Sequence, residues 1–273
     1  MKAVWGAVLA LVIWRPLPAI AGPRAAKLDT ALQASVTSDG SFDVIVRAKP
    51  GRESIVKSRV RQTSGLSTHD VVNGFSATLN AREIVALAND PDVDGVSLNA
   101  DVSALGVPPA PGLNQNDRTT QSGSPFATYR SSVISDLKQS LGLDNTFSGF
   151  NTTIAVVDSG IAPNVDFGGR IVAQYVFSKG RQYYTPPFDD YGHGTHVAGL
   201  IAATGTTSNN KYAGIAPGAK LLALKVLDAQ GTGKTSDVIN AIEFAIANKT
   251  RFGINIINVS LGHPIYELSL IHI

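Results

Sequence analysis

Cysteine is absent from the 273-residue chain, which excludes disulfide bonds, thiolate nucleophiles and cysteine-bound metal sites. An excess of one charge is also lacking, because 23 Lys and Arg face 21 Asp and Glu and the basic residues are scattered. The composition therefore offers no basic patch for phosphates and argues against nucleic-acid binding. A hydrophobic content of 44% indicates a globular protein with a proper core, in one large or two modest domains.

A hydrophobic run long enough to span a bilayer is missing from the N-terminus. The apolar stretch at residues 3–14 falls short of the roughly 20 residues that a transmembrane helix needs. It follows a lysine and precedes small residues at 19–21, a pattern typical of an export signal cleaved after Ala21. We therefore expect residues 1–21 to be a signal peptide and the protein to be secreted or periplasmic, without membrane attachment after cleavage. An uncleaved anchor is the alternative.

Residues 41–103 alternate between strand and helix patterns. Asn73-Gly74 lies between two β-prone runs, which is a strong hairpin signal. Asn80 followed by Glu83 predicts a capping box at the start of a helix that Pro91 closes. The resulting order βαββαβ predicts a ferredoxin-like α+β domain. The other predicted elements are a strand at 43–48, an amphipathic helix within 52–61 and a strand near 93–98.

An acidic turn within this domain has the spacing of a calcium loop. Asp90, Asp92 and Asp94 match the opening of an EF-hand, but Pro91 stiffens the segment and Asp101 stands where a bidentate Glu belongs. We interpret it as a polar turn and predict no metal site there.

Residues 104–127 separate the two halves of the chain. Their Pro, Gly, Asn, Gln and Ser content predicts an exposed linker without a core of its own. The sequence from 128 onward then alternates apolar strands with helices, which predicts a parallel α/β sheet. The expected elements are a helix at 129–141, strands at 153–157, 170–177, 220–226 and 254–257, and a helix at 236–248.

Polar residues stand at the ends of these strands, where open parallel sheets bind ligands. Asp158 follows one strand and Ser260 another, while His193 opens an apolar helical run between two glycines. An imidazole is suited to general-base catalysis because its pKa lies near neutral pH. The pattern therefore predicts Asp158 and His193 along one rim of the sheet.

Three segments carry a family resemblance. Residues 193–199, His-Gly-Thr-His-Val-Ala-Gly, resemble the histidine motif of the subtilisin-like serine peptidases, the subtilase family. The segments at 154–160 and 258–262 repeat the match in the family's order. The resemblance implies a peptidase acting on polypeptides, with catalytic Asp158 and His193 and no cofactor or catalytic metal; structural calcium is not readable. It implies substrate-binding roles for Ser260, Leu261 and Gly262, and for Gly231 in a loop across the cleft.

The resemblance also implies a precursor. Residues 41–103, most visibly Val-Asn-Gly-Phe-Ser-Ala at 72–77, resemble an inhibitory propeptide that acts on its own catalytic domain. Maturation would then cut within 104–127, and residues 128–267 would be the first part of the catalytic domain. Residues 268–273 resemble the translated end of a sequencing-library transposon, so we expect a non-native tail, with an ordinary short strand as the alternative.

The nucleophile is the missing part of this interpretation. Neither the family's Gly-Thr-Ser block nor its oxyanion-hole asparagine occurs in the sequence. Ser260 is a poor substitute, because its segment lacks the first glycine of a nucleophile elbow. The chain as it stands is therefore predicted to be inactive.

Two other functions remain open. A metal-dependent hydrolase could use His193, His196, Asp158 and either Asp189 or Asp190, although His-x-x-His lacks the zincin spacing and its glutamate base. A non-catalytic inhibitor or chaperone module could use the propeptide-like domain alone.

Overall fold

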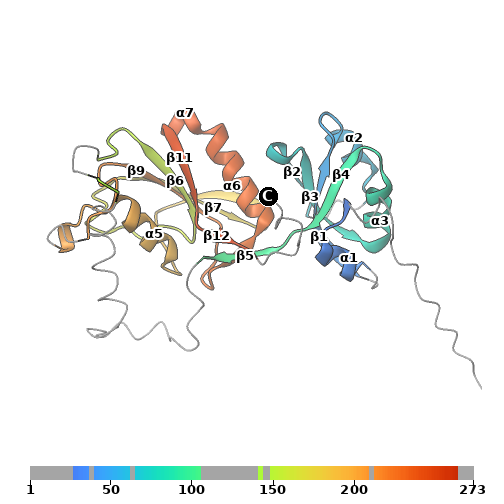
Figure 1. Cartoon of the computed structure of the whole chain (residues 1–273), viewed down its shortest axis with the longest axis horizontal. Coiled ribbons are helices and arrows are strands. Elements are labelled where there is room, and N and C mark those ends of the chain that lie inside the picture. Colours follow the sequence, from blue (N-terminus) through green and yellow to red (C-terminus); the bar gives the residue numbers. More distant parts are fainter. Residues whose placement is uncertain are drawn as a thin grey trace, which may run out of the picture.

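The chain forms two sheet-bearing halves that lie side by side and are joined through the extended segment β5 (Asp101–Ala104) (Figure 1). The computed structural model describes residues 27–36, 40–61, 65–105, 141–143, 148–208 and 212–263. The predicted signal peptide, linker residues 106–127, the helix expected from 129 and the tail at 268–273 lie outside these residues. Within the described ranges, no helix is both long and apolar enough to cross a membrane.

The N-terminal half is an antiparallel sheet in the order β2-β3-β1-β4. From β1 onward its strands and α-helices follow in the order strand, helix, strand, strand, helix, strand, which agrees with the predicted βαββαβ pattern, and the additional helix α1 precedes β1. Residues of β1, β3 and β4 pack with the helices in one apolar core that includes Phe75, Leu79 and Ile84. The elements are α1 (Thr30–Ser35), β1 (Ser41–Ala48), α2 (Glu53–Arg59), β2 (Ser67–His69), β3 (Gly74–Asn80), α3 (Ala81–Asn89) and β4 (Val93–Leu98).

The predicted hairpin at Asn73-Gly74 differs in detail. The β-prone residues before the turn form a 3₁₀ turn, η2 (Asp70–Val72), so the paired strand is β2, at 67–69. Asn73 takes the left-handed conformation with φ 50°, which asparagine tolerates better than most residues. Val71 therefore leaves the ladder, and its N–H donates to Glu243 of the other half at 3.0 Å.

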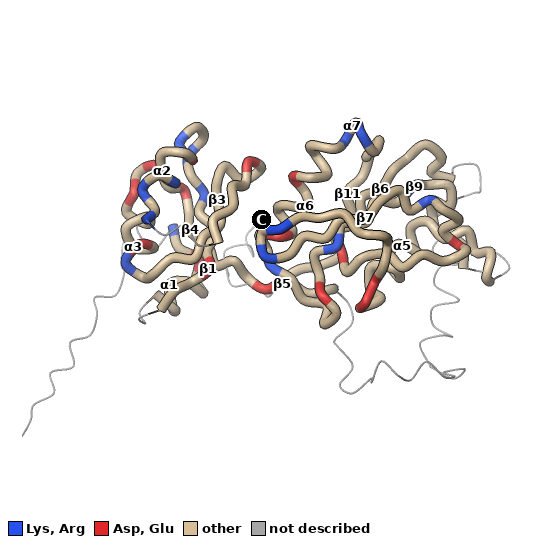
Figure 2. The backbone as a smooth tube through the Cα atoms, turned by 180° about the vertical axis from the view of Figure 1, so that it is seen from behind, with Lys and Arg blue, Asp and Glu red and all other residues tan. Residues whose placement is uncertain are grey.

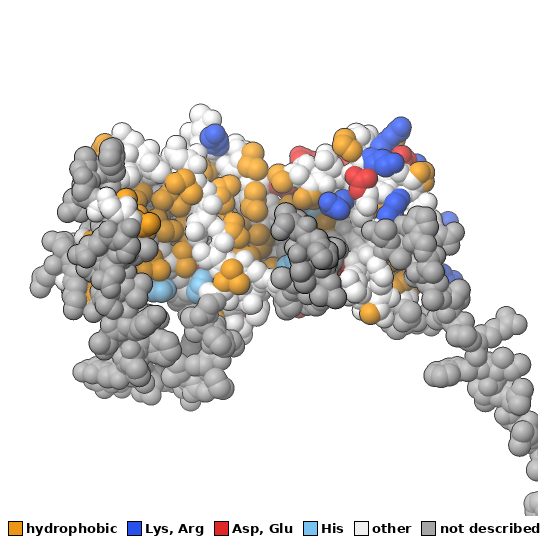
Figure 3. Space-filling view, viewed as in Figure 1, with side chains coloured by type: hydrophobic (Ala, Val, Ile, Leu, Met, Phe, Trp, Pro, Cys, Tyr) orange, Lys and Arg blue, Asp and Glu red, His pale blue; other side chains and the backbone are white. Residues whose placement is uncertain are grey.

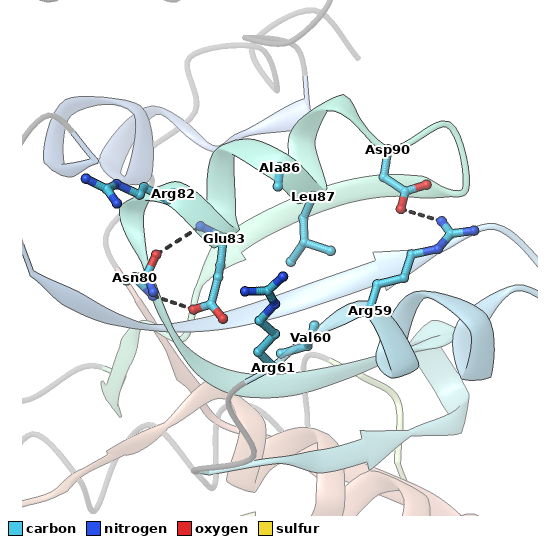
Figure 4. Close-up of a pocket in the computed structure, with 9 residues that line it drawn as sticks. All are labelled: Arg59, Val60, Arg61, Asn80, Arg82, Glu83, Ala86, Leu87 and Asp90. Atoms are coloured by element: carbon cyan, nitrogen blue, oxygen red, sulfur yellow. Dashed lines mark hydrogen bonds and ion pairs between the residues drawn. The ribbon is translucent and has the colours of Figure 1, made fainter.

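The capping and turn signals around α3 are confirmed (Figure 4). Asn80 Oδ1 accepts from the Glu83 N–H at 3.0 Å, and Glu83 Oε2 accepts from the Asn80 N–H at 3.1 Å. At the far end of α3, Asp90 and Asp92 both bind the guanidinium of Arg59. The acidic turn therefore acts as a partner for α2, in keeping with its interpretation as a polar turn.

The second half is a five-stranded sheet in the order β11-β6-β9-β7-β8. The four strands predicted from the sequence are parallel, and β8 adds an antiparallel edge through a hairpin with β7. Within the described residues β11 is the opposite edge, where the side chains of Ile256 and Val259 are exposed. Figure 3 shows apolar side chains gathered on one face of this half. The elements are β6 (Thr153–Asp158), β7 (Ile171–Ser178), β8 (Arg181–Thr185), α5 (His193–Ala202), η3 (Thr206–Ser208), β9 (Lys220–Lys225), α6 (Thr235–Ala247), α7 (Lys249–Phe252) and β11 (Ile254–Val259).

The central strands β6 and β9 are buried on both faces, with successive side chains pointing to opposite sides of the sheet. Ile154 and Val156 of β6 pack toward α5, whereas Ala155 and Val157 pack toward α6. The strands can therefore be apolar throughout, as expected for parallel strands covered by helices. This double burial fixes β6 and α5 together and so positions the residues at their ends.

The segment β5 was not predicted. It forms a three-stranded sheet with β10 (Thr232–Lys234) on one side and β12 (Leu261–Gly262) on the other. Ala104, the first residue of the predicted linker, is the last residue of this strand. The chain between the two halves therefore begins as a strand bound to the second half.

The N-terminal half also completes α6. Lys234, the residue that precedes this helix, gives no side-chain cap. Instead, Asn99 Oδ1 accepts from the Ser236 N–H at 2.9 Å, and the Ala100 carbonyl accepts from the Thr235 N–H at 3.0 Å. Unsatisfied N–H groups at a helix start are thus capped by another part of the chain.

We expect the stability of the protein to depend on pH through His69, at the contact between the halves. Its side chain is fully buried, its ring nitrogens lack hydrogen-bond partners, and Glu243 Oε2 lies 3.9 Å from Nδ1. Burial lowers the pKa of His69, outweighing the Glu243 carboxylate, the Asn240 side chain and the carboxylates of Asp237 and Asp70, all of which act in the opposite direction. As pH falls, His69 is protonated in the unfolded chain before it is protonated in the folded one. The stabilisation that depends on neutral His69 is therefore complete above about pH 6.5 and is lost as pH falls through the lowered pKa.

His69→Phe should therefore reduce the fall in the free energy of unfolding between pH 7.5 and pH 5.5, measured by urea denaturation. Wild-type protein measured in the same buffers is the reference. An unchanged fall in His69→Phe would contradict this prediction.

Candidate active site

Asp158 and His193 lie in direct contact at the carboxyl end of the parallel sheet. His193 Nδ1 is 2.8 Å from Asp158 Oδ1 and 2.9 Å from Oδ2. Asp158 is the last residue of β6 and fully buried, and His193 is the first residue of α5. The two residues predicted on one rim are thus brought together from positions 35 residues apart.

Glycine makes this meeting sterically possible. Gly192 precedes α5 with φ 101°, a conformation that other residues rarely adopt. A Cβ on Gly194 would lie 2.2 Å from the Gly160 carbonyl oxygen, so the start of α5 touches the turn after β6 backbone to backbone. The glycines of both motifs therefore set the distance between the carboxylate and the imidazole.

The environment of Asp158 orients the histidine. Burial raises the pKa of Asp158, and hydrogen bonds from His193 and from the Ser159 N–H offset this only in part. A carboxylate that accepts from Nδ1–H fixes the imidazole tautomer and leaves Nε2 for proton transfer. His193 Nε2 faces the carbonyl oxygen of Leu105 at 3.1 Å, the residue directly after β5.

Asp189 holds the loop that leads into α5. Its Oδ1 accepts from the N–H groups of Tyr191 and Gly192, and its Oδ2 accepts from the N–H and hydroxyl of Thr195. Burial opposes its charge, but the hydrogen bonds from Thr195 and Gly192 hold the pKa of Asp189 below its ordinary value. Asp189 thus acts as a structural anchor for His193.

Among the described residues, the side chains proposed for a metal site do not come together as a set of ligands. In the parts of the chain that the structure describes, no three His, Asp or Glu side chains converge in a manner that would hold a metal. Asp190 is bound to the Lys225 ammonium, and the Asp189 oxygens are occupied by hydrogen bonds within its loop. The contacts of these residues therefore favour a structural role for both.

The four predicted substrate-binding residues surround β5. The Gly231 carbonyl accepts from the Ala104 N–H at 3.2 Å, and the Ser260 carbonyl accepts from the Leu105 N–H at 3.1 Å. Leu261 and Gly262 pair with Ala104 and Ser103 in the β12 ladder. A strand therefore lies between the two segments predicted to flank a substrate, and it leads directly to His193.

Sequence reasoning missed one buried charge at this site. Lys225 ends β9 beside Asp158 in the ladder and is only 5% exposed. The single lysine inside the apolar run Leu-Leu-Ala-Leu-Lys-Val-Leu was the available signal, since an unpaired lysine is rarely buried. Figure 2 shows the Lys and Arg positions of this half in blue, on α7 as well as along the sheet.

Similar proteins are found among the bacterial serine peptidases. The chain is 42% identical to serine protease AprX of Bacillus subtilis (strain 168) over 120 residues, covering 43% of this chain and 26% of that protein. It is 35% identical to subtilisin E of the same organism over 196 residues, covering 71% and 43%. It is 31% identical to the minor extracellular protease Epr over 231 residues, covering 83% and 32%. The chain thus spans less than half the length of these relatives.

The fold has a solved counterpart as well. Fervidolysin from Fervidobacterium pennivorans, a keratinolytic enzyme related to subtilisin, superposes with a TM-score of 0.56 at 22% sequence identity, covering 85% of this chain and 37% of that one. At this identity the match speaks for the fold alone. The family model described as Subtilase family matches residues 149–268, which include Asp158, His193 and Ser260. The chain therefore carries a subtilase-family region at residues 149–268.

Proposed function

We propose that this chain comes from the precursor of a secreted serine endopeptidase, in which residues up to Leu105 form an inhibitory propeptide. One observation carries the proposal: β5 occupies the cleft as an extended substrate would, with the Leu105 carbonyl beside His193 Nε2. Peptides that bind by adding a strand gain affinity from main-chain hydrogen bonds, as here with Gly231 and Ser260. Export would depend on the signal peptide proposed at residues 1–21.

In this proposal Asp158 and His193 are two members of a catalytic triad, and His193 is its general base. His193 Nε2 takes the proton of an attacking serine hydroxyl, and Asp158 stabilises the imidazolium that forms. Among the described residues, Nε2 lies against the Leu105 carbonyl rather than a hydroxyl. The family's serine block and its oxyanion-hole asparagine are not found in the 273 residues.

The same contacts suggest where maturation occurs. We place the scissile bond between Leu105 and Gly106, because the Leu105 carbonyl is the one that faces His193. Val102 is buried in the core beneath the cleft, and the Leu105 side chain packs 3.3 Å from the Cβ position of Gly262. A polypeptide substrate would then offer apolar side chains at these two positions.

The alternative of an inhibitor module forms part of this proposal, with the N-terminal half as the inhibitor. The N-terminal half has its own core, and β5 provides its contact with the cleft. Because β5 uses the main-chain groups that a substrate needs, its binding would exclude substrate.

The purified 273-residue chain should not hydrolyse peptides, because proton transfer to His193 needs the missing serine hydroxyl. A fluorogenic peptide assay at pH 8 measures this, with subtilisin E as the positive control. Turnover that a serine-directed phosphonate abolishes would contradict the prediction.

Residues 22–105 should inhibit an intact subtilase, and Ala104→Pro should weaken that inhibition. Proline removes the N–H that donates to the Gly231 carbonyl, and a lost hydrogen bond that leaves a buried acceptor costs about 1–3 kcal/mol, or roughly 5- to 150-fold in inhibition constant. Ala104→Gly keeps this N–H and is the matched control. Equal inhibition by the proline and glycine variants would count against binding through β5.

A further inference from the structure

An ammonium group lies buried beneath the Asp158–His193 pair. The side chain of Lys225 is 6% exposed, and its Nζ makes three hydrogen bonds. The acceptors are the Ser159 carbonyl at 2.8 Å, the Leu227 carbonyl at 2.6 Å and Asp190 Oδ1 at 2.6 Å. An ammonium has three N–H donors, so every donor is used. This complete pairing is what makes burial of the charge tolerable.

The three acceptors belong to three different segments of the site. Ser159 lies in the turn directly after Asp158, and Leu227 begins the loop that carries Gly231. Asp190 lies in the loop that leads to His193. The Lys225 ammonium is therefore a single point of attachment for the carboxylate, the imidazole and one wall of the cleft.

The main chain around Lys225 strengthens this attachment. Lys225 lies opposite Asp158 in the parallel ladder between β9 and β6. The N–H groups of the next two residues, Val226 and Leu227, both donate to the Asp158 carbonyl, at 2.8 Å and 3.3 Å. The Phe188 ring centroid lies 5.3 Å from Nζ and shields the ammonium from the side of the histidine loop.

We propose that Lys225 is a positioning residue that holds Asp158 and His193 at hydrogen-bonding distance by tying the Ser159 turn to the Asp190 loop. This inference rests on the proposed function only for its catalytic meaning. The three hydrogen bonds of Nζ go to two carbonyls and to Asp190, which leaves no donor for the Asp158 carboxylate. Lys225 therefore acts on the position of the pair rather than as the counter-ion of Asp158.

The hydrogen bond itself can be observed without any peptidase activity. In the ¹⁵N-labelled 273-residue chain, the His193 Nδ1–H proton should resonate at low field and exchange slowly with water. Lys225→Met keeps the length of the side chain and removes its donors. We expect this proton to exchange about tenfold faster, since charge-assisted hydrogen bonds anchor both loops. Amide protons of Val157 and Leu224 serve as the internal reference and should keep their protection.

Lys220→Met is the matched control, because Lys220 is exposed at the opposite end of the same strand. It should leave the His193 proton unchanged. Lys225→Arg keeps the charge and should restore part of the slow exchange, which a merely space-filling role would not predict. A folded Lys225→Met chain with wild-type exchange at His193 would overturn the proposal, as would equal acceleration of the Val157 and Leu224 amides.

Asp190→Ala tests the same attachment from its outer side, where the Asp190 side chain is 42% exposed and its loss should not prevent folding. It should also speed exchange of the His193 proton, and wild-type exchange in this variant would overturn the proposal even where Lys225→Met fails to fold. Absence of the low-field proton from the unmodified chain would instead refute the Asp158–His193 pairing, and with it the proposed catalytic function. The two failures are therefore distinguishable.

Discussion

The site depends on a place where two backbones touch. The turn after β6 and the first turn of α5 meet at Gly160 and Gly194, where a Cβ on Gly194 would lie 2.2 Å from a carbonyl oxygen. Only this approach lets a buried carboxylate at a strand end reach an imidazole at a helix start, at 2.8 Å. The apolar sides of β6 and α5 are buried between the sheet and the helix, while Asp189 and Lys225 hold the loops at their polar ends by hydrogen bonds. Packing thus sets the coarse distance, and hydrogen bonds to the two loops refine it.

The N-terminal half contributes to the cleft as well as filling it. Asn99 and Ala100 cap the start of α6, and the next three residues, 101–103, pair with β10, the strand just before that helix. The same short stretch therefore stabilises the wall of the cleft and enters the cleft. A propeptide with these contacts would favour the folded form of the wall it blocks, because a ligand that binds only the folded state stabilises it.

Much of this arrangement could be predicted from residue patterns. The parallel strands were predictable as short apolar runs. Asn80 and Glu83 predicted a capping box because both of its hydrogen bonds are local and need no distant partner. Asp158 and His193 were predictable because parallel strands deliver their carboxyl ends to one edge. What failed depends on partners far away in the chain. Val71 has a β-prone side chain, but it lies outside the strand ladder because its N–H donates to Glu243. The segment β5 is a strand only because β10 and β12 lie on either side of it. Lys225 resembles a surface residue until its three acceptors are assembled.

The ring of His193 links the site to the strand that occupies it. Nδ1 lies against the Asp158 carboxylate and Nε2 faces the Leu105 carbonyl, so both ring nitrogens are engaged. A general base must lie within hydrogen-bond reach of the hydroxyl from which it takes a proton. A strand whose carbonyl stands at Nε2 would therefore block the base as well as the main-chain groups that an extended substrate needs.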